Sequence, residues 1–272
     1  MDVLHTLDGA AVEAVPAAWS LVPYATYTSC VVVERAVLGW SGHLARLAGG
    51  VDALWGHPLD PDDVRTAVAA HLALLPDPDA ARALRVTAHP ADLDLLDPAA
   101  ATGVRLLVSS RPAAFPPAVT DTFTVGTVAH TRELAGVKST SLLEQVRLRR
   151  EARLAGHDDA LFVTGEQVLE GSTWTVLVWR GDDVVTPAGP VLPSTTAGHL
   201  GAIAVAAGGT ATQAEVTLAD LHEADLVMAV NVNTPARAIS AVDGRRLPLD
   251  RDRLGGLAAA YAALPREPVA PA

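Results

Sequence analysis

Gly136-Val137-Lys138-Ser139-Thr140-Ser141-Leu142-Leu143-Glu144 contains the only lysine of this 272-residue chain. The other nineteen basic residues are arginines. Arginine stays protonated and cannot act as an amine nucleophile, whereas a lysine in an apolar pocket can lose its proton and form a Schiff base with a carbonyl. A genome that favours arginine would also leave a single lysine by chance. The residues that follow Lys138 therefore decide between a chemical and an accidental role.

Composition limits the classes of protein that this chain could represent. The formal net charge is -11 and the isoelectric point is near 5.2, so no basic surface is available for nucleic acid or for an acidic membrane. Half of the residues are apolar, which is ample for a folded core. We therefore expect a soluble enzyme or small-molecule binder, with no nucleic acid and no membrane as partners.

Cysteine content and the N-terminus indicate the compartment. Cys30 is the only cysteine, so an intramolecular disulfide and a thiolate cluster are excluded, and we predict no metal site. Residues 1–8 lack the basic and apolar regions of a signal peptide, and no later apolar run is long enough to span a membrane. These features predict a cytoplasmic protein.

Hydrophobic periodicity predicts an α/β (α+β) fold in two domains. Helical spacing is found in residues 41–58, 61–76, 142–154 and 251–264 and after Ser194. Strand-like runs cover residues 28–34, 83–88, 103–108, 123–128, 159–164, 174–179, 183–186, 211–216, 226–230 and 238–242. Three prolines in residues 112–117 indicate an interdomain connection. We place a small domain at 1–112, a linker at 113–122 and a larger domain at 123–272, with a frayed tail at 265–272.

The lysine stretch and the residues that follow it match the pattern of a known family. Residues 136–152 read GVKSTSLLEQVRLRREA, residues 156–162 read GHDDALF and residues 168–173 read VLEGST. This order and spacing resembles the class IV aminotransferases, the fold-type IV enzymes that use pyridoxal 5'-phosphate (PLP). The resemblance implies a small α+β domain and a larger α/β domain with the cofactor in the cleft between them. It also implies a homodimer.

The resemblance assigns cofactor roles to particular residues. Lys138 would bind PLP and, once displaced by substrate, move a proton as general base. Glu170 would pair with the pyridine nitrogen and keep it protonated; a solvated turn carboxylate is the alternative. Residues 192–198, LPSTTAG, resemble the family's phosphate segment, which nominates Thr195 and Thr196, although helix capping would give the same pattern. The remaining predicted cofactor contacts are Arg46, in the HLARL segment, and Ser172 and Thr173.

Substrate recognition is where the sequence departs from the family. The glycine-rich stretch that lines the family's substrate pocket is replaced by Tyr24-Ala25-Thr26-Tyr27-Thr28-Ser29-Cys30. The candidates for contacting an amino acid or keto acid substrate are Tyr24, Thr26, Arg85, His89, Arg105 and Asn231. The acidic pairs Asp158-Asp159 and Asp182-Asp183 are expected to be solvated turn residues rather than metal ligands.

The resemblance leaves three functions open. The first is transamination between an amino acid and a 2-oxo acid through a Lys138 Schiff base. The second is 4-amino-4-deoxychorismate lyase, which releases pyruvate and 4-aminobenzoate, because Leu134-Ala135-Gly136-Val137-Lys138 and Asn231 resemble that subgroup. The third is a non-catalytic relative that has lost its pocket, although a sole lysine at the expected position argues against it.

Overall fold

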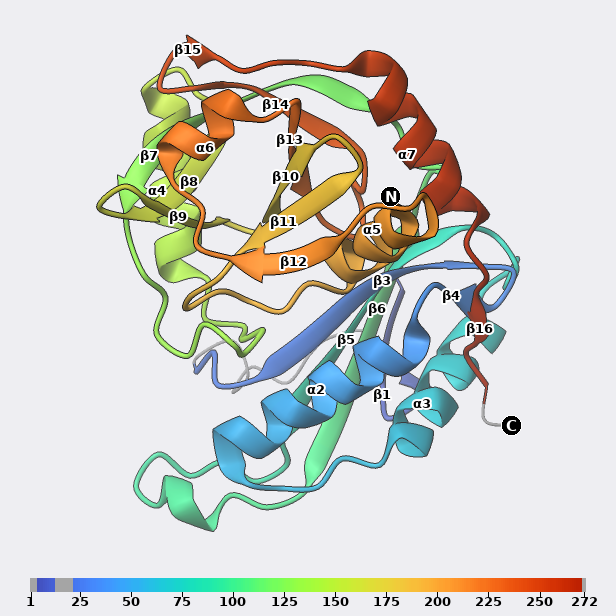
Figure 1. Cartoon of the computed structure of the whole chain (residues 1–272). Coiled ribbons are helices and arrows are strands. Elements are labelled where there is room, and N and C mark those ends of the chain that lie inside the picture. Colours follow the sequence, from blue (N-terminus) through green and yellow to red (C-terminus); the bar gives the residue numbers. More distant parts are fainter. Residues whose placement is uncertain (1–3, 13–21, 271–272) are drawn as a thin grey trace. The chain divides into compact units, whose positions relative to one another are not determined.

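A computed structural model describes residues 4–12 and 22–270 of the chain (Figure 1). The chain divides into two compact units. In its described parts, the first unit is built from Met1–Phe115, Val137–Ser141 and Pro265–Ala272, and the second from Pro116–Gly136 and Leu142–Leu264. The first unit thus takes in the short segment that carries Lys138. The predicted ranges of the two domains and their linker stay predictions.

The described residues of the first unit form a seven-stranded antiparallel sheet. In sheet order its strands are β16 (Glu267–Pro268), β4 (Ala36–Val37), β3 (Thr26–Val33), β5 (Arg82–Pro90), β6 (Val104–Pro112), β1 (Leu4–Leu7) and β2 (Ala10–Ala11). Helices α2 (Trp40–Trp55) and α3 (Pro61–Ala73) pack on this sheet (Figure 1). The Asp60 side chain caps α3 by accepting from the backbone N–H of Asp62, and Pro61 occupies the first turn. A short 3-10 helix, η1 (Pro98–Ala100), lies between β5 and β6.

The C-terminal segment is not frayed, contrary to the expectation from its prolines. Glu267 and Pro268 pair with β4, and the backbone N–H of Val269 donates to the Arg35 carbonyl at 2.9 Å. Val269 is only 2% exposed. Burial of this side chain and strand pairing hold residues 265–270 against the first unit, which composition alone could not show.

The described residues of the second unit form a nine-stranded mixed sheet. Its strands, in sheet order, are β12 (Ala211–Ala214), β11 (Asp183–Pro187), β10 (Thr175–Arg180), β13 (Leu226–Val230), β14 (Arg237–Val242), β7 (Thr120–Ala129), β8 (Asp159–Thr164) and β9 (Gln167–Gly171), with β15 (Arg245–Arg246) paired to β14. Strands β14, β7 and β8 run parallel to one another. The helices of this unit are α4 (Leu143–Leu154), α5 (Thr195–Ala206), α6 (Leu218–Glu223) and α7 (Arg251–Ala263).

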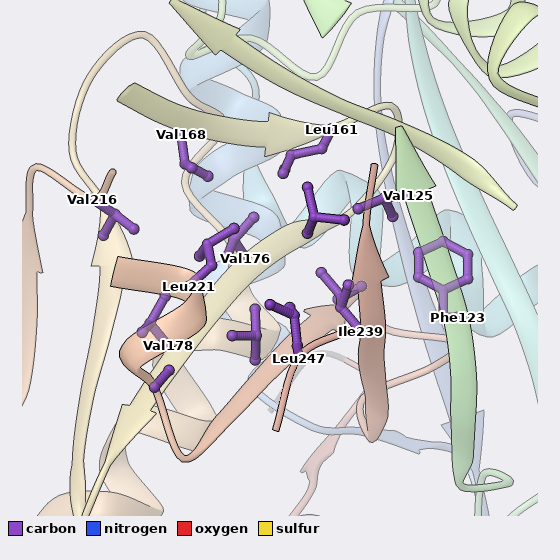
Figure 2. Close-up of a cluster of buried hydrophobic side chains, with 14 of the residues drawn as sticks. Phe123, Val125, Leu161, Val168, Val176, Val178, Val216, Leu221, Ile239 and Leu247 are labelled. Carbon is purple, nitrogen blue, oxygen red and sulfur yellow. The ribbon is translucent and has the colours of Figure 1, made fainter. Parts of the chain in front are cut away.

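One apolar core cluster organises the second unit (Figure 2). Leu161 from β8, Val176 from β10 and Ile239 from β14 are each fully buried in it. The ring of Phe123 meets the Trp174 ring edge-on, with 5.6 Å between centroids. This cluster fixes the strands whose ends carry the polar residues described below.

Most of the predicted elements are confirmed, and the differences have local causes. Strand β7 begins at Thr120, three residues before the predicted run. Helix α6 was not predicted, because it is only six residues long; its signal is the capping box between Thr217 and Asp220. Strand β9 was predicted only as a turn followed by the EGST motif. In the described part of the chain, no helix is both long and apolar enough to cross a membrane.

Candidate functional site

Strand β3 holds the backbone of Lys138 within the first unit. The carbonyl oxygen of Lys138 accepts from the backbone N–H of Tyr27 at 2.9 Å and from the Thr26 hydroxyl at 3.2 Å. The backbone N–H of Thr140 donates to the Ala25 carbonyl at 2.8 Å. Thr26 was predicted to contact substrate, and here it positions the lysine. These bonds fix the backbone from which the Lys138 side chain projects.

Tyr27 brings two cationic side chains together beside β3. The Lys138 amine lies 4.8 Å from the centre of the Tyr27 ring, and the Arg85 guanidinium lies 3.7 Å from it. Arg85 Nε also donates to the Thr87 hydroxyl at 3.3 Å. Among the described residues no carboxylate forms an ion pair with Arg85. The first unit therefore presents a partly buried positive charge next to its lysine.

Burial lowers the pKa of the basic groups around this lysine. Desolvation lowers the pKa of Arg85, and the neighbouring Tyr27 opposes that shift. His89 is buried, and desolvation followed by the charge of Arg85 lowers its pKa to about 4. His89 is thus a neutral imidazole at pH 7. An anion bound at Arg85 would be stabilised by a guanidinium that has lost part of its hydration.

Arg46 reaches the same strand from α2. Its Nη2 donates to the Thr28 hydroxyl at 3.1 Å, and that hydroxyl also contacts His43 Nδ1 at 2.8 Å. Desolvation lowers the pKa of the Arg46 guanidinium, with Tyr27 and Cys30 opposing the shift. The HLARL segment thus supplies both a charged donor and the histidine that orients its hydroxyl partner.

Glu170 is the last residue but one of β9 in the second unit and is buried, which removes the alternative of a solvated turn carboxylate. Arg132 Nε donates to Glu170 Oε1 at 2.6 Å, and their side chains are 11% and 7% exposed. Arg132 also donates to the Ala135 carbonyl at 2.6 Å. The backbone N–H of Leu192 donates to Glu170 Oε2 at 3.1 Å. Each carboxylate oxygen therefore has at least one donor.

The Leu192 contact ties Glu170 to the N-terminus of α5. Ser194 caps this helix by accepting from the backbone N–H of Ala197 at 3.2 Å. Thr195 and Thr196 follow in the first turn, and Thr196 is buried. Free N–H groups and hydroxyls at a helix N-terminus form an anion site. Ser194 therefore carries the capping role that was the alternative for the two threonines.

Several residues that were predicted to contact cofactor or substrate form hydrogen bonds or ion pairs with other residues of the protein. The Ser172 hydroxyl donates to Asp159, and Thr173 accepts from Arg149. The Tyr24 hydroxyl donates to the Leu54 carbonyl at the end of α2. Arg105 forms an ion pair with Asp8, and Asn231 donates to the Thr173 carbonyl at 3.2 Å while accepting from Thr234 at 3.0 Å.

The expectation for the acidic pairs is wrong at one position. Asp159 is 3% exposed and is surrounded by hydrogen-bond donors, whereas Asp158 is exposed. Asp182 and Asp183 are both exposed, and Asp183 accepts from Thr210. Sequence reading also missed Tyr27 and Arg132 as site residues. For Asp159 the sequence holds no signal of its burial, because both faces of β8 are buried and its residues do not alternate.

Each unit, taken by itself, carries donors of the kind that PLP needs. In the first unit, the Lys138 amine suits the cofactor's aldehyde and the Arg46 guanidinium suits its phosphate. In the second unit, the N-terminus of α5 suits a phosphate and the buried Glu170 carboxylate suits a pyridinium N–H.

Comparison with known proteins agrees with PLP as the cofactor. Residues 25–242 match the family described as amino-transferase class IV. None of the curated proteins compared with the chain matches it in sequence. Among solved structures, a branched-chain aminotransferase from Thermoproteus uzoniensis with norvaline has a TM-score of 0.83 at 19% identity, covering 95% of this chain and 93% of that one. A Brucella abortus aminotransferase bound to PLP has a TM-score of 0.81 at 20% identity, covering 96% and 99%. A PLP-bound hypothetical aminotransferase from Mycobacterium tuberculosis has a TM-score of 0.80 at 19% identity, covering 96% and 99%.

The chain belongs to the class IV aminotransferase family, since the family match spans most of its length. The predicted family and fold class are confirmed. PLP as the cofactor and a PLP-dependent transaminase as the enzyme class are confirmed as well. The roles of the individual site residues stay predictions.

Proposed function

We propose that the enzyme moves an amino group between an amino acid and a 2-oxo acid, with PLP bound covalently at Lys138. The observation that carries this proposal is the setting of the chain's sole lysine. Its backbone is fixed by β3 and its amine lies over the Tyr27 ring, with the Arg85 guanidinium on the same ring.

Lys138 acts as the base that moves the proton between the substrate Cα and the cofactor. Bound PLP supplies an electron-withdrawing ring that stabilises negative charge at that carbon. The two half-reactions of transamination both need this proton transfer, so one amine serves both. Thr26 and Tyr27 support it by holding the Lys138 carbonyl, which limits where its side chain can reach.

Glu170 accepts the N–H of the cofactor's pyridine ring. Arg132 orients the Glu170 carboxylate, because a charge-assisted hydrogen bond from a guanidinium fixes the direction of its partner. Arg46, Thr195 and Thr196 bind the phosphate, and the positive end of the α5 dipole adds to their effect. Ser172 and Thr173 support Glu170 from the turn that follows it, through the bond from Ser172 to Asp159 and the bond from Arg149 to Thr173.

Arg85 binds the carboxylate of the substrate. Its guanidinium has no carboxylate partner among the described residues, and a planar fork of donors suits a carboxylate. The charge of Arg85 helps to lower the pKa of His89, so His89 adds a neutral imidazole ring beside the proposed carboxylate site. Amino acids and 2-oxo acids share the required carboxylate, so one residue can serve donor and acceptor.

We also propose that the enzyme works as a homodimer in the cytoplasm. The solved structures that share its fold are aminotransferases, and the family resemblance implies a pair of subunits. The single cysteine supports a reducing compartment: Cys30 is buried, and burial raises the pKa of its thiol to about 12. Analytical ultracentrifugation of the purified chain tests the dimer.

A substrate screen tests the reaction itself. PLP-loaded enzyme would be given pairs of amino acids and 2-oxo acids, and separately aminodeoxychorismate, while amino transfer and pyruvate release are measured together. We expect amino transfer with at least one pair. Pyruvate and 4-aminobenzoate appearing from aminodeoxychorismate without any amino transfer would assign the lyase reaction instead.

A further inference from the structure

We propose that Asp159 is a positioning residue for Glu170, acting through the turn that joins β9 to β10. This inference rests on the proposed role of Glu170 toward PLP. Asp159 begins β8 and belongs to a sequence pair that looks like a solvated turn, yet it is 3% exposed. Hydrogen-bond donors must offset the free-energy cost of burying a carboxylate. The residues that supply those donors show which part of the chain Asp159 holds in place.

Two donors of Asp159 come from the turn after Glu170, and the others are Arg149 on α4 and the backbone N–H of Ala160. Asp159 Oδ1 accepts from the Ser172 hydroxyl at 2.6 Å, and Asp159 Oδ2 accepts from Trp174 Nε1 at 3.0 Å. Arg149 donates to Asp159 Oδ2 from Nε at 2.9 Å and to the Thr173 hydroxyl from Nη2 at 2.5 Å. Asp159, directly or through Arg149, therefore engages the three consecutive residues Ser172, Thr173 and Trp174.

Further contacts restrict the backbone of this turn. The backbone N–H of Gly171 donates to the Trp174 carbonyl at 2.9 Å, and the indole ring of Trp174 covers Gly171 so closely that an added Cβ would lie 1.9 Å from Cε2. Asn231 also restrains the turn, because its side-chain amide donates to the Thr173 carbonyl. Glu170 is covalently joined to this turn, so fixing Gly171 fixes the end of β9.

Glu170 is thus held from two directions. Arg132 and the Leu192 N–H hold its carboxylate, while Asp159 holds the backbone segment from which its side chain projects. A site keeps its geometry only when the groups that orient its contacting residues are themselves fixed. Replacing the Asp159 carboxylate by an amide would remove its charge and one acceptor oxygen, so Ser172, Trp174 and Arg149 could not all keep their acceptor, and Arg149 would lose its ion pair.

The chain offers a matched control in the neighbouring residue. Asp158 is exposed and accepts from the backbone N–H and the hydroxyl of Thr124, at 2.8 and 2.9 Å, on a different strand. Asp159→Asn and Asp158→Asn therefore make the same chemical change one residue apart. Full-length protein stripped of PLP would be titrated with PLP, and the visible absorbance of the loaded enzyme would be followed against pH. Glu170→Gln would be measured beside them.

We expect Asp159→Asn to weaken PLP binding by about tenfold and to move the pH midpoint of the visible band in the direction that Glu170→Gln moves it. Asp158→Asn should match the wild type in both. A loss of fold stability alone would lower the melting temperature without moving that midpoint. If Asp159→Asn behaves like Asp158→Asn while Glu170→Gln changes both quantities, the positioning role is wrong. If Glu170→Gln changes neither, the proposed role of Glu170 itself is wrong.

Single-donor variants keep the test valid should Asp159→Asn fail to fold. Ser172→Ala and Trp174→Phe each remove one donor and leave the Asp159 carboxylate in place. Each should weaken PLP binding by a few-fold, and Ser172→Ala should add nothing in the Asp159→Asn background, because Ser172 acts through Asp159. Wild-type affinity in both single variants would overturn the proposal. A further loss from Ser172→Ala in the Asp159→Asn background would also overturn it, by showing that Ser172 binds the cofactor itself.

Discussion

The two units use charge in opposite ways. Around Tyr27 in the first unit, Lys138 and Arg85 share one ring, and no carboxylate among the described residues pairs with Arg85. Around β9 in the second unit, the buried carboxylates of Glu170 and Asp159 have a donor on every oxygen. A buried cation without an anion costs free energy unless something binds it, whereas a carboxylate with all of its donors in place is held still.

This difference assigns the two regions different tasks. The surroundings of Tyr27 are prepared to receive an anion, which for an aminotransferase is the carboxylate of an amino acid or 2-oxo acid. The surroundings of Glu170 are prepared to hold one group at a fixed place for the cofactor's pyridine ring. Under the proposed function, substrate recognition and cofactor orientation depend on different sheets, so we expect that a variant can impair one and leave the other intact.

Among all the variants, we expect Glu170→Gln, in the region around β9, to lower turnover the most. Replacing the carboxylate by a neutral amide removes the charge that keeps the pyridine nitrogen protonated, so turnover should fall by roughly 100- to 1,000-fold. PLP should still attach to Lys138. Steady-state kinetics and the visible spectrum would measure both. Glu166→Gln, the same change at an exposed turn four residues earlier, should leave turnover unchanged; equal turnover in the two variants would contradict the assignment.

Arg85→Gln tests the region around Tyr27. Removing the guanidinium takes away a charged hydrogen-bond pair with the substrate carboxylate, which is worth about 1.5–3 kcal/mol, so KM for the amino donor should rise roughly 10- to 100-fold. PLP affinity should not change. Arg105→Gln serves as the control, because Arg105 is already paired with Asp8. A wild-type KM in Arg85→Gln would remove Arg85 from the substrate site.

We expect the smallest changes in stability and turnover from alanine substitutions at two adjacent glycines in α2. A Cβ on Gly50 would lie 2.3 Å from the Thr26 hydroxyl, which holds the Lys138 carbonyl, whereas a Cβ on Gly49 would meet nothing within 4 Å. Gly49→Ala should stabilise the protein by about 0.5–1 kcal/mol through helix propensity. Gly50→Ala should destabilise it and slow turnover a few-fold. Thermal unfolding and initial rates distinguish the two, and equal behaviour would show that the close contact with Thr26 does not matter.

Sequence alone predicted the fold class and the residues that a local motif carries. The family pattern from Gly136 to Thr173 contains Lys138 and Glu170, and hydrophobic periodicity places α4 and the central strands. The C-terminal segment was misjudged, because its pairing with β4 joins residues more than two hundred positions apart. No local signal reports such a contact.

The supporting residues of the site could not be predicted for the same reason. Arg132 meets Glu170 from a separate segment, and the burial of Asp159 depends on donors that follow it by 13 and 15 residues. In sequence, Asp158 and Asp159 are two equal acids. Only the strand that begins at Asp159 turns one of them into the interior and leaves the other in water.

Reduction of the PLP-loaded enzyme with borohydride, followed by peptide mapping, tests the central claim most directly. Because Lys138 is the only lysine of the chain, the side-chain amines offer one place for the label. We predict a yellow protein whose visible band is bleached by borohydride, with the pyridoxyl group recovered on Lys138 alone. A protein that takes up no PLP, or a label found on any other amine, would contradict the account.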